Sequence, residues 1–158
     1  DVKKSEVHGM AQRGGCVSSH VRYGDKVYSP LAGKGSVDIL VSFEKMETLR
    51  HVDYLREGGV AIVNDEELFP PAVTLGDEVY PAAVLSLLKK TLSTVKALKA
   101  TDMAFQAGDR RMANTVMLGA LSSFTDVDAP LWKDVLRDSL PERLVEKNIA
   151  AFDTGRTY

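Results

Sequence analysis

The chain of 158 residues has a single cysteine, Cys16, and only 7% aromatic residues. One thiol rules out an intrachain disulfide, and it also rules out an iron–sulfur cluster held by this chain alone, because such a cluster normally takes four cysteine thiolates. No apolar run approaches the roughly 20 residues that cross a bilayer, so no membrane span is predicted. The chain has neither an Arg-rich transit segment nor a signal-peptide pattern, which leaves the cytoplasm as the expected location.

The chain also has no large excess of positive or negative charge. The formal net charge is −2, and no basic stripe is interleaved with aromatic residues, so we expect no nucleic-acid partner. Hydrophobic residues make up 44% and charged residues 27% of the chain, as in ordinary globular proteins. A chain of this length is expected to form one domain, residues 1–158, that buries roughly 70% of its unfolded surface.

The middle of the chain alternates between strand and helix patterns. Apolar, β-branched runs at residues 37–43 and 60–63 are typical of strands buried on both faces, and residues 44–55 between them are predicted to be helical. A third short strand is predicted at residues 95–99, after a helix over residues 81–91 that begins with a proline. This order predicts an α/β fold with a mostly parallel central sheet.

The two ends of the chain have different patterns. Residues 2–7 and 16–23 are predicted strands, and a turn at Gly24-Asp25 predicts a β-hairpin between residues 16–23 and 26–29. Residues 64–80 show no clean periodicity, and loops of this length are usually functional. The C-terminal third is predicted to be helical over residues 103–107, 110–122, 130–138 and 141–152, the last with an apolar stripe of Leu144, Val145, Ile149 and Phe152.

The sequence HGMAQRGG joins the first two predicted strands. One interpretation is a loop that covers a cofactor or an acyl intermediate, because Arg13 and Gln12 offer hydrogen bonds and Met10 offers an adaptable apolar contact. The glycines Gly14 and Gly15 permit close approach of a ligand to the backbone. The alternative is a polar loop whose glycines only satisfy turn geometry, and the loop residues alone favour neither interpretation.

Two histidines, His8 and His20, lie near Cys16 in the sequence, as in a thiol nucleophile or a metal site. Neither is favoured, because a thiol enzyme needs an orienting carboxylate and zinc needs a fourth ligand, for which no spaced motif exists. Cys16 is therefore predicted to be a small buried residue of a strand. The chain also lacks the GDG…NN pattern by which thiamine-diphosphate enzymes hold magnesium and pyrophosphate.

Asn114 opens a predicted helix that is flanked by Arg110 and Arg111. If that helix is mostly buried, the Asn114 amide needs protein partners or faces a ligand. The two arginines are more often a solvated helix end than a phosphate clamp, because most surface charge is simply solvated. Asn114 is therefore a candidate binding residue.

Several motifs occur in the order of a known enzyme family. They are HGMAQRGG, the SHVR of residues 19–22, the VYSP of residues 27–30 and VDILVSFE from residue 37, followed by Gly58-Gly59, Asn64, Tyr80-Pro81, RMANTVMLGAL and the segment around residues 148–152. On these motifs, which extend over nearly the whole chain, it resembles the small subunit of indolepyruvate ferredoxin oxidoreductase and the gamma domain of the 2-oxoacid:ferredoxin oxidoreductases. The resemblance implies a three-layer Rossmann-like fold.

In one respect the chain differs from that family. Members open with a strand and a GxGGxG-like glycine loop before a helix, whereas this chain starts at Asp1, within what would be the second strand, and has no initiator methionine. We therefore expect its first β-α unit to be missing, together with the ligand contacts of that glycine loop.

The resemblance implies an accessory subunit of a heteromeric enzyme. Such enzymes decarboxylate 2-oxoacids, here aryl ones such as indolepyruvate, join the acyl group to coenzyme A and pass electrons to ferredoxin. Thiamine diphosphate, Mg²⁺ and iron–sulfur clusters are expected on the large subunit, in agreement with the single cysteine and the missing GDG pattern. This chain is expected to hold no cofactor alone and to help close the active site of that partner. The residues expected to face the site are His8, Met10, Gln12, Arg13, Gly14, Gly15 and Asn114.

Two alternatives remain open. The chain can be a stand-alone module that binds a nucleotide-like ligand, which a complete glycine-rich loop at the true N-terminus would favour. It can also be a purely structural partner that only stabilises the large subunit.

Overall fold

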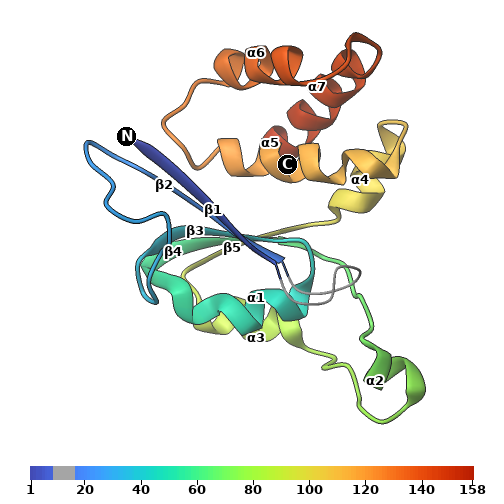
Figure 1. The fold of residues 1–158 in the computed structure, drawn as a ribbon. Helices are drawn as coiled ribbons and strands as arrows, with labels where there is room; N and C mark the ends of the chain where they lie inside the picture. The colour runs from blue at the N-terminus through green and yellow to red at the C-terminus, as the bar shows by residue number, and fades with distance from the viewer. Residues whose placement is uncertain (9–16) are drawn as a thin grey trace.

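The computed structural model describes residues 1–8 and 17–158, which form a two-stranded sheet, a three-stranded sheet and the helices that cover the three-stranded one (Figure 1). The strands are β1 (Val2–His8), β2 (Val17–Tyr23), β3 (Val37–Ser42), β4 (Leu55–Asn64) and β5 (Thr94–Leu98). The α-helices are α1 (Lys45–His51), α2 (Pro71–Leu75), α3 (Val84–Thr91), α4 (Ala100–Gln106), α5 (Ala113–Ser122), α6 (Ala129–Ser139) and α7 (Glu142–Thr157), and two 3₁₀ turns are η1 (Val52–Tyr54) and η2 (Arg110–Met112).

The larger sheet confirms the predicted parallel arrangement. Its strand order is β3-β4-β5, and both pairings are parallel. Three successive residues of the central strand, Ala61, Ile62 and Val63, are fully buried, as expected for a strand covered on both faces. Ala61 and Val63 pack with residues of α1 and α3, whereas Ile62 packs with residues of α4, α5 and α7. The result is a sheet between two layers of helices (Figure 1).

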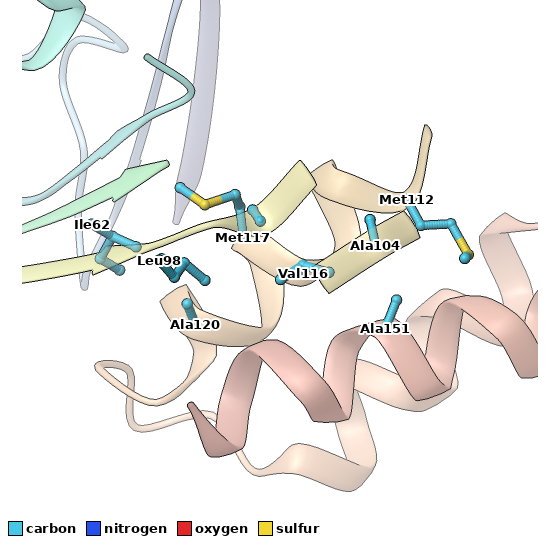
Figure 2. Packing of buried hydrophobic residues seen from close by; sticks show 9 residues of the cluster. Ile62, Leu98, Ala104, Met112, Val116, Met117, Ala120 and Ala151 are labelled. Carbon is cyan, nitrogen blue, oxygen red and sulfur yellow. The ribbon is translucent and has the colours of Figure 1, made fainter. Parts of the chain in front are cut away.

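The layer of α4, α5 and α7 contains the larger core cluster, shown in Figure 2 with Ile62, Leu98, Ala104, Met112, Val116, Met117, Ala120 and Ala151. Most of these side chains are small or medium in size, so the helices approach closely. The closest approach is between α5 and α7, where Gly119 lies against the backbone of Phe152 and Gly155 lies against the backbone of Val116. These two helices therefore pack backbone to backbone.

The last helix is longer than predicted, and its buried face matches the predicted apolar stripe only in part. It continues to Thr157, and its buried residues are Asn148, Ala151, Phe152 and Gly155. Leu144, placed in the apolar stripe by its spacing, is exposed instead. Phe152 of the predicted stripe is fully buried, and Val145 and Ile149 are half-buried. Ala151 and Gly155, which the stripe did not include, are buried because small residues allow the close backbone approach to α5.

The predicted β-hairpin near the N-terminus is confirmed, but its predicted pairing between residues 16–23 and 26–29 is wrong. The structure pairs β1 with β2 in antiparallel register, with Val2 opposite Tyr23 and Ser5 opposite His20, and residues 26–29 form no strand. Backbone groups of this loop are used by the hairpin itself: the Val27 N–H donates to the Asp1 carboxylate at 3.0 Å, and the Arg22 guanidinium donates to the Ser29 carbonyl at 2.9 Å. The loop therefore braces the open end of β1 and β2.

One face of the β1–β2 hairpin exposes four apolar side chains together with Lys4, Glu6 and Ser19. Because side chains alternate along strands and direct partners share a face, Val2, Val17, Val21 and Tyr23 lie on the same side, and all four are exposed. His20, on the other side, accepts a hydrogen bond from the Ala32 N–H at 3.2 Å. None of the helices in the described residues is both long and apolar enough to cross a membrane.

We predict that Gly119→Ala and Gly155→Ala each lower the free energy of unfolding. A methyl group at either position overlaps a backbone carbonyl of the opposite helix, and overpacking of this kind costs about 1–3 kcal/mol even where alanine favours the helix. Chemical denaturation monitored by circular dichroism measures the loss. Gly24→Ala is the matched control, because Gly24 has open space around it and should change stability by less than about 0.5 kcal/mol. Wild-type stability for both helix variants would contradict the α5–α7 contact.

Candidate functional site at the carboxyl edge of the sheet

The parallel strands β3, β4 and β5 end together at one edge of the sheet, which we call the carboxyl edge. Ligands of open α/β sheets bind outside this edge, because the loops that follow the strands meet there. Each strand is followed here by polar residues: Glu44 after β3, Asp65 and Glu66 after β4, and Lys99 and Thr101 after β5. The carboxyl edge is therefore the candidate functional site.

Asn64, the last residue of β4, is the centre of the hydrogen-bond network at this edge. Its side chain is 2% exposed, and its Oδ1 accepts from the Ala100 N–H at 2.8 Å. Its Nδ2 donates to the Phe43 carbonyl at 3.2 Å and to Glu66 Oε2 at 2.8 Å. One amide thus connects the segments that follow β3, β4 and β5.

Glu66 receives a second hydrogen bond in the same network. The Thr101 hydroxyl donates to Glu66 Oε2 at 2.6 Å, so the carboxylate is held by donors from β4 and α4. Charge-assisted hydrogen bonds of this kind are stronger than neutral ones and fix the orientation of the acceptor. The carboxyl edge therefore presents an ordered negative charge.

Glu44 is a buried carboxylate, 5% exposed, at the start of α1. Its Oε2 caps the helix by accepting from the Glu47 N–H at 3.0 Å, and its Oε1 accepts a hydrogen bond from the Tyr80 hydroxyl. Burial and the hydrogen bond to Glu44 raise the pKa of Tyr80 well above its ordinary value. Tyr80 is therefore a neutral donor across the physiological pH range.

Lys45 binds the acidic segment that follows β4. Its Nζ lies 2.7 Å from Glu67 Oε1 and 3.2 Å from Asp65 Oδ1. Burial by itself lowers the pKa of Lys45, but the hydrogen bonds to Glu67 and Asp65 together outweigh it, so the pKa is raised. Lys45 therefore stays charged and holds this segment against α1.

A small hollow opens beside Asn64. Its volume is about 80 Å³, which is enough for a few waters or one small polar group and well below the roughly 300 Å³ of a typical ligand pocket. Its lining is Asn64, Asp65, Glu66, Lys99, Thr101, Asp102 and Arg110. The described residues contain no group of three or more His, Cys, Asp or Glu side chains placed to hold a metal ion. Within the described residues, the carboxyl edge accordingly has ordered polar groups but lacks the enclosure that a substrate needs.

Most of the predicted site residues lie outside the described residues. Met10, Gln12, Arg13, Gly14 and Gly15 fall in residues 9–16, and so does Cys16. His8 ends β1, with its backbone opposite Val17.

Asn114 and its neighbours are placed by the structure. Asn114 is exposed at the second position of α5, so water can solvate its amide and no buried partner is required. Arg111 is exposed and donates to Asp109 at 2.6 Å, and this hydrogen bond lowers the pKa of Asp109 to about 2. Arg110 lines the hollow. The predicted solvated helix end is thus confirmed for Arg111, whereas Arg110 belongs to the carboxyl edge.

The sequence interpretation did not select the residues of the network. Glu44, Asn64 and Tyr80 stand in the motifs of the resemblance, but Glu66 and Thr101 carry no motif. One signal was available: all of these residues except Tyr80 come at, or within three residues after, the end of a buried strand. In a parallel sheet, residues at such positions meet at one edge.

The whole chain matches a known family. The family model described as "Pyruvate ferredoxin/flavodoxin oxidoreductase" matches residues 1–158. The proteins named indolepyruvate oxidoreductase subunit IorB from Pyrococcus horikoshii and from Thermococcus kodakarensis are 36% and 35% identical to it, over 98% of this chain and 79% of each relative. A 2-oxoglutarate synthase subunit KorC from Methanothermobacter marburgensis is 28% identical over 97% of this chain and 77% of the relative.

Solved structures share the fold. The gamma subunit of a keto/oxoacid ferredoxin oxidoreductase from Geobacter sulfurreducens superposes with a TM-score of 0.68 at 24% identity, covering 99% of this chain and 78% of that one. The pyruvate oxidoreductase subunit PORC from Thermotoga maritima superposes with a TM-score of 0.69 at 22% identity, covering 99% and 79%. The α/β arrangement described above is therefore the arrangement of known gamma subunits.

We predict that Tyr80→Phe lowers the free energy of unfolding by about 1–3 kcal/mol, because the buried Glu44 carboxylate loses a donor. Tyr28→Phe is the control, since Tyr28 is exposed.

The raised pKa of Tyr80 also predicts a pH dependence. The unfolded tyrosine ionises first, so the stability due to Tyr80 is complete below a pH of about 10 and is lost as the pH rises above it. A titration of phenolate absorbance should therefore find one of the five tyrosines protonated until the chain unfolds. The tyrosine that ionises only on unfolding should be missing in Tyr80→Phe. Ionisation of all five tyrosines in the folded wild type would contradict the Glu44 contact.

Proposed function

This chain belongs to the pyruvate ferredoxin/flavodoxin oxidoreductase family, and from that membership we propose that residues 1–158 form the gamma-type domain of an enzyme for aryl 2-oxoacids such as indolepyruvate. The chain is an accessory subunit of a 2-oxoacid:ferredoxin oxidoreductase, a complex with larger subunits. The choice of substrate rests on sequence identity to this chain. Four relatives named as indolepyruvate oxidoreductase subunits are 32–36% identical to it, whereas the 2-oxoglutarate synthase subunits are 28% identical.

The reaction is an oxidative decarboxylation. The 2-oxoacid loses carbon dioxide, its acyl carbon forms a thioester with coenzyme A, and the electrons released go to ferredoxin. Thiamine diphosphate supplies the electron sink for the acyl carbanion. We place it, with Mg²⁺ and the iron–sulfur clusters, on the large subunit, because this chain has only one cysteine and no thiamine-diphosphate motif.

The proposed work of this chain is to form one wall of the active site of the large subunit. The carboxyl edge suits this role because its polar groups are fixed before any ligand arrives, and a closed site keeps water from a reactive acyl intermediate. In Figure 1 the His8 end of β1 lies on the same side of the molecule as the carboxyl ends of β3, β4 and β5. This placement supports the proposal that the HGMAQRGG residues face the partner beside that edge.

The residues proposed to face the active site keep their assignments from the sequence. Arg13 and Gln12 bind a carboxylate or phosphate group of a substrate, and Gly14 and Gly15 allow its close approach. His8, Met10 and Asn114 complete the set. Three exposed apolar residues at one end of the β1–β2 hairpin, Val2, Val21 and Tyr23, also support an accessory role, because neighbouring exposed apolar side chains usually mark an interaction surface.

Reconstitution tests this function. The chain is combined with a thiamine-diphosphate-containing large subunit of the same family, and reduction of ferredoxin or a viologen dye is followed with coenzyme A and a 2-oxoacid. We expect activity well above that of the large subunit alone, with kcat/KM higher for indolepyruvate than for 2-oxoglutarate or pyruvate. Absence of any gain would refute the accessory role, and a preference for 2-oxoglutarate would refute the substrate.

We predict that Arg13→Ala lowers kcat/KM of the reconstituted enzyme by roughly 10-fold or more, because a charge-assisted hydrogen bond to the substrate is lost. The mass of the complex, measured by light scattering, should not change. Arg143→Ala is the matched control, since Arg143 is exposed on α7. Full activity of the Arg13→Ala complex would mean that the HGMAQRGG loop has no active-site role and would favour a purely structural subunit.

A further inference from the structure

Residues 65–80, which include α2, leave the body of the molecule at the carboxyl end of β4 and return to it before α3 (Figure 1). We call this segment the arm. We propose that the arm is a preformed element by which the subunit binds its large partner, in an apolar groove with basic residues at its rim. The identity of the partner rests on the proposed function; the binding role rests on the arm itself.

The arm exposes an unusual amount of apolar surface. Leu75 is 77% exposed and Val79 is 91% exposed, and Leu68 and Phe69 are exposed as well. Single exposed hydrophobic residues are normal on a protein surface, but four large ones within twelve residues of one protruding segment mark an interaction site. These side chains gain by burial against another molecule, because the body of this chain does not cover them.

The base of the arm is firmly attached. Lys45 binds Asp65 and Glu67 where the arm begins, and the Tyr80 hydroxyl donates to Glu44 where it ends. The Phe69 ring packs edge-on against the Tyr80 ring, with 5.3 Å between centroids. The two ends of the arm are thus joined to each other and to α1.

The tip of the arm also has a defined shape. Helix α2 begins with Pro71, and it ends at Gly76, whose φ of 87° lies in the left-handed region. The Asp77 N–H donates to the Ala72 carbonyl at 2.9 Å and closes the turn. A segment ordered in this way before binding loses less conformational entropy in a complex than a flexible loop.

The charge of the arm indicates the chemistry of its partner. Residues 65–80 contain five acidic side chains and no lysine, arginine or histidine. Three of the five, at positions 65–67, bind Lys45, Asn64 and Thr101 at the base. The other two, Asp77 and Glu78, are exposed at the tip beside Leu75 and Val79. A complementary surface is therefore apolar with cationic groups at its rim.

The large subunit fits this description better than a second copy of the chain. In a symmetric dimer formed through the arms, Asp77 and Glu78 of both copies would face each other, and such like-charge contacts are unfavourable. The arm begins at the carboxyl edge, which is the wall that the proposed function assigns to the active site of the partner. A large subunit seated against that edge lies within reach of the arm.

The test compares binding of the purified chain to the purified large subunit. Leu75→Ser/Val79→Ser removes the two most exposed apolar side chains of the arm and should raise Kd by roughly 10-fold or more, as for residues at the centre of an interface. Leu131→Ser on α6, where Leu131 is 56% exposed, is the matched control and should leave Kd within about 2-fold. Both variants should keep the wild-type circular dichroism spectrum. Equal affinity of the arm variant and the wild type would overturn the proposal.

A second variant tests the charge. Asp77→Asn/Glu78→Gln should slow association at low salt and make the association rate less dependent on salt, while kcat at saturating subunit stays unchanged. An unchanged salt dependence would contradict the proposal that basic residues of the partner lie at the rim of the groove. If the wild type binds but the complex has no oxidoreductase activity, the proposed function is refuted, whereas the binding role of the arm is still supported. If the complex is active but arm variants change only self-association in ultracentrifugation, the assignment to the large subunit fails.

Discussion

The side-chain amide of Asn64 is the interaction on which the carboxyl edge depends. It accepts from the backbone at the start of α4 and donates to the backbone after β3 and to Glu66. Because Asn64 is buried, losing one of these partners would cost free energy, so the ends of the three strands are fixed relative to one another. The hollow, the ordered carboxylate of Glu66 and the start of the arm all take their positions from this residue.

In the part of the chain that the structure describes, the carboxyl edge is ordered but not enclosed. Its polar groups are ordered, yet its hollow is too small to hold a 2-oxoacid together with a cofactor. Exposed apolar side chains are found on the arm, which begins at this edge, and on the hairpin. These features agree with the proposed role of an accessory subunit. A rigid wall of an active site needs neighbouring surfaces that attach it to the chain that performs the chemistry.

The packing behind the wall provides its rigidity. Helices α5 and α7 meet through Gly119 and Gly155, which brings their backbones together and lets the core cluster fill the space above β4 and β5. On the opposite face, Ala61 and Val63 pack against α1 and α3. Helix α1 carries Glu44 and Lys45 at its start, so the packing of this face also sets the position of the arm.

The sequence alone determined the parts of this protein that depend on near neighbours. Buried, β-branched runs with helical segments between them predicted the parallel sheet, and the motifs predicted the family. Only the tertiary structure decided which polar residues meet. Ala100 and Asn64 are 36 residues apart, and so are Tyr80 and Glu44. It also decided that β2 pairs with β1, because Asp1 and Arg22 occupy backbone groups of the loop that local turn chemistry had assigned to a strand.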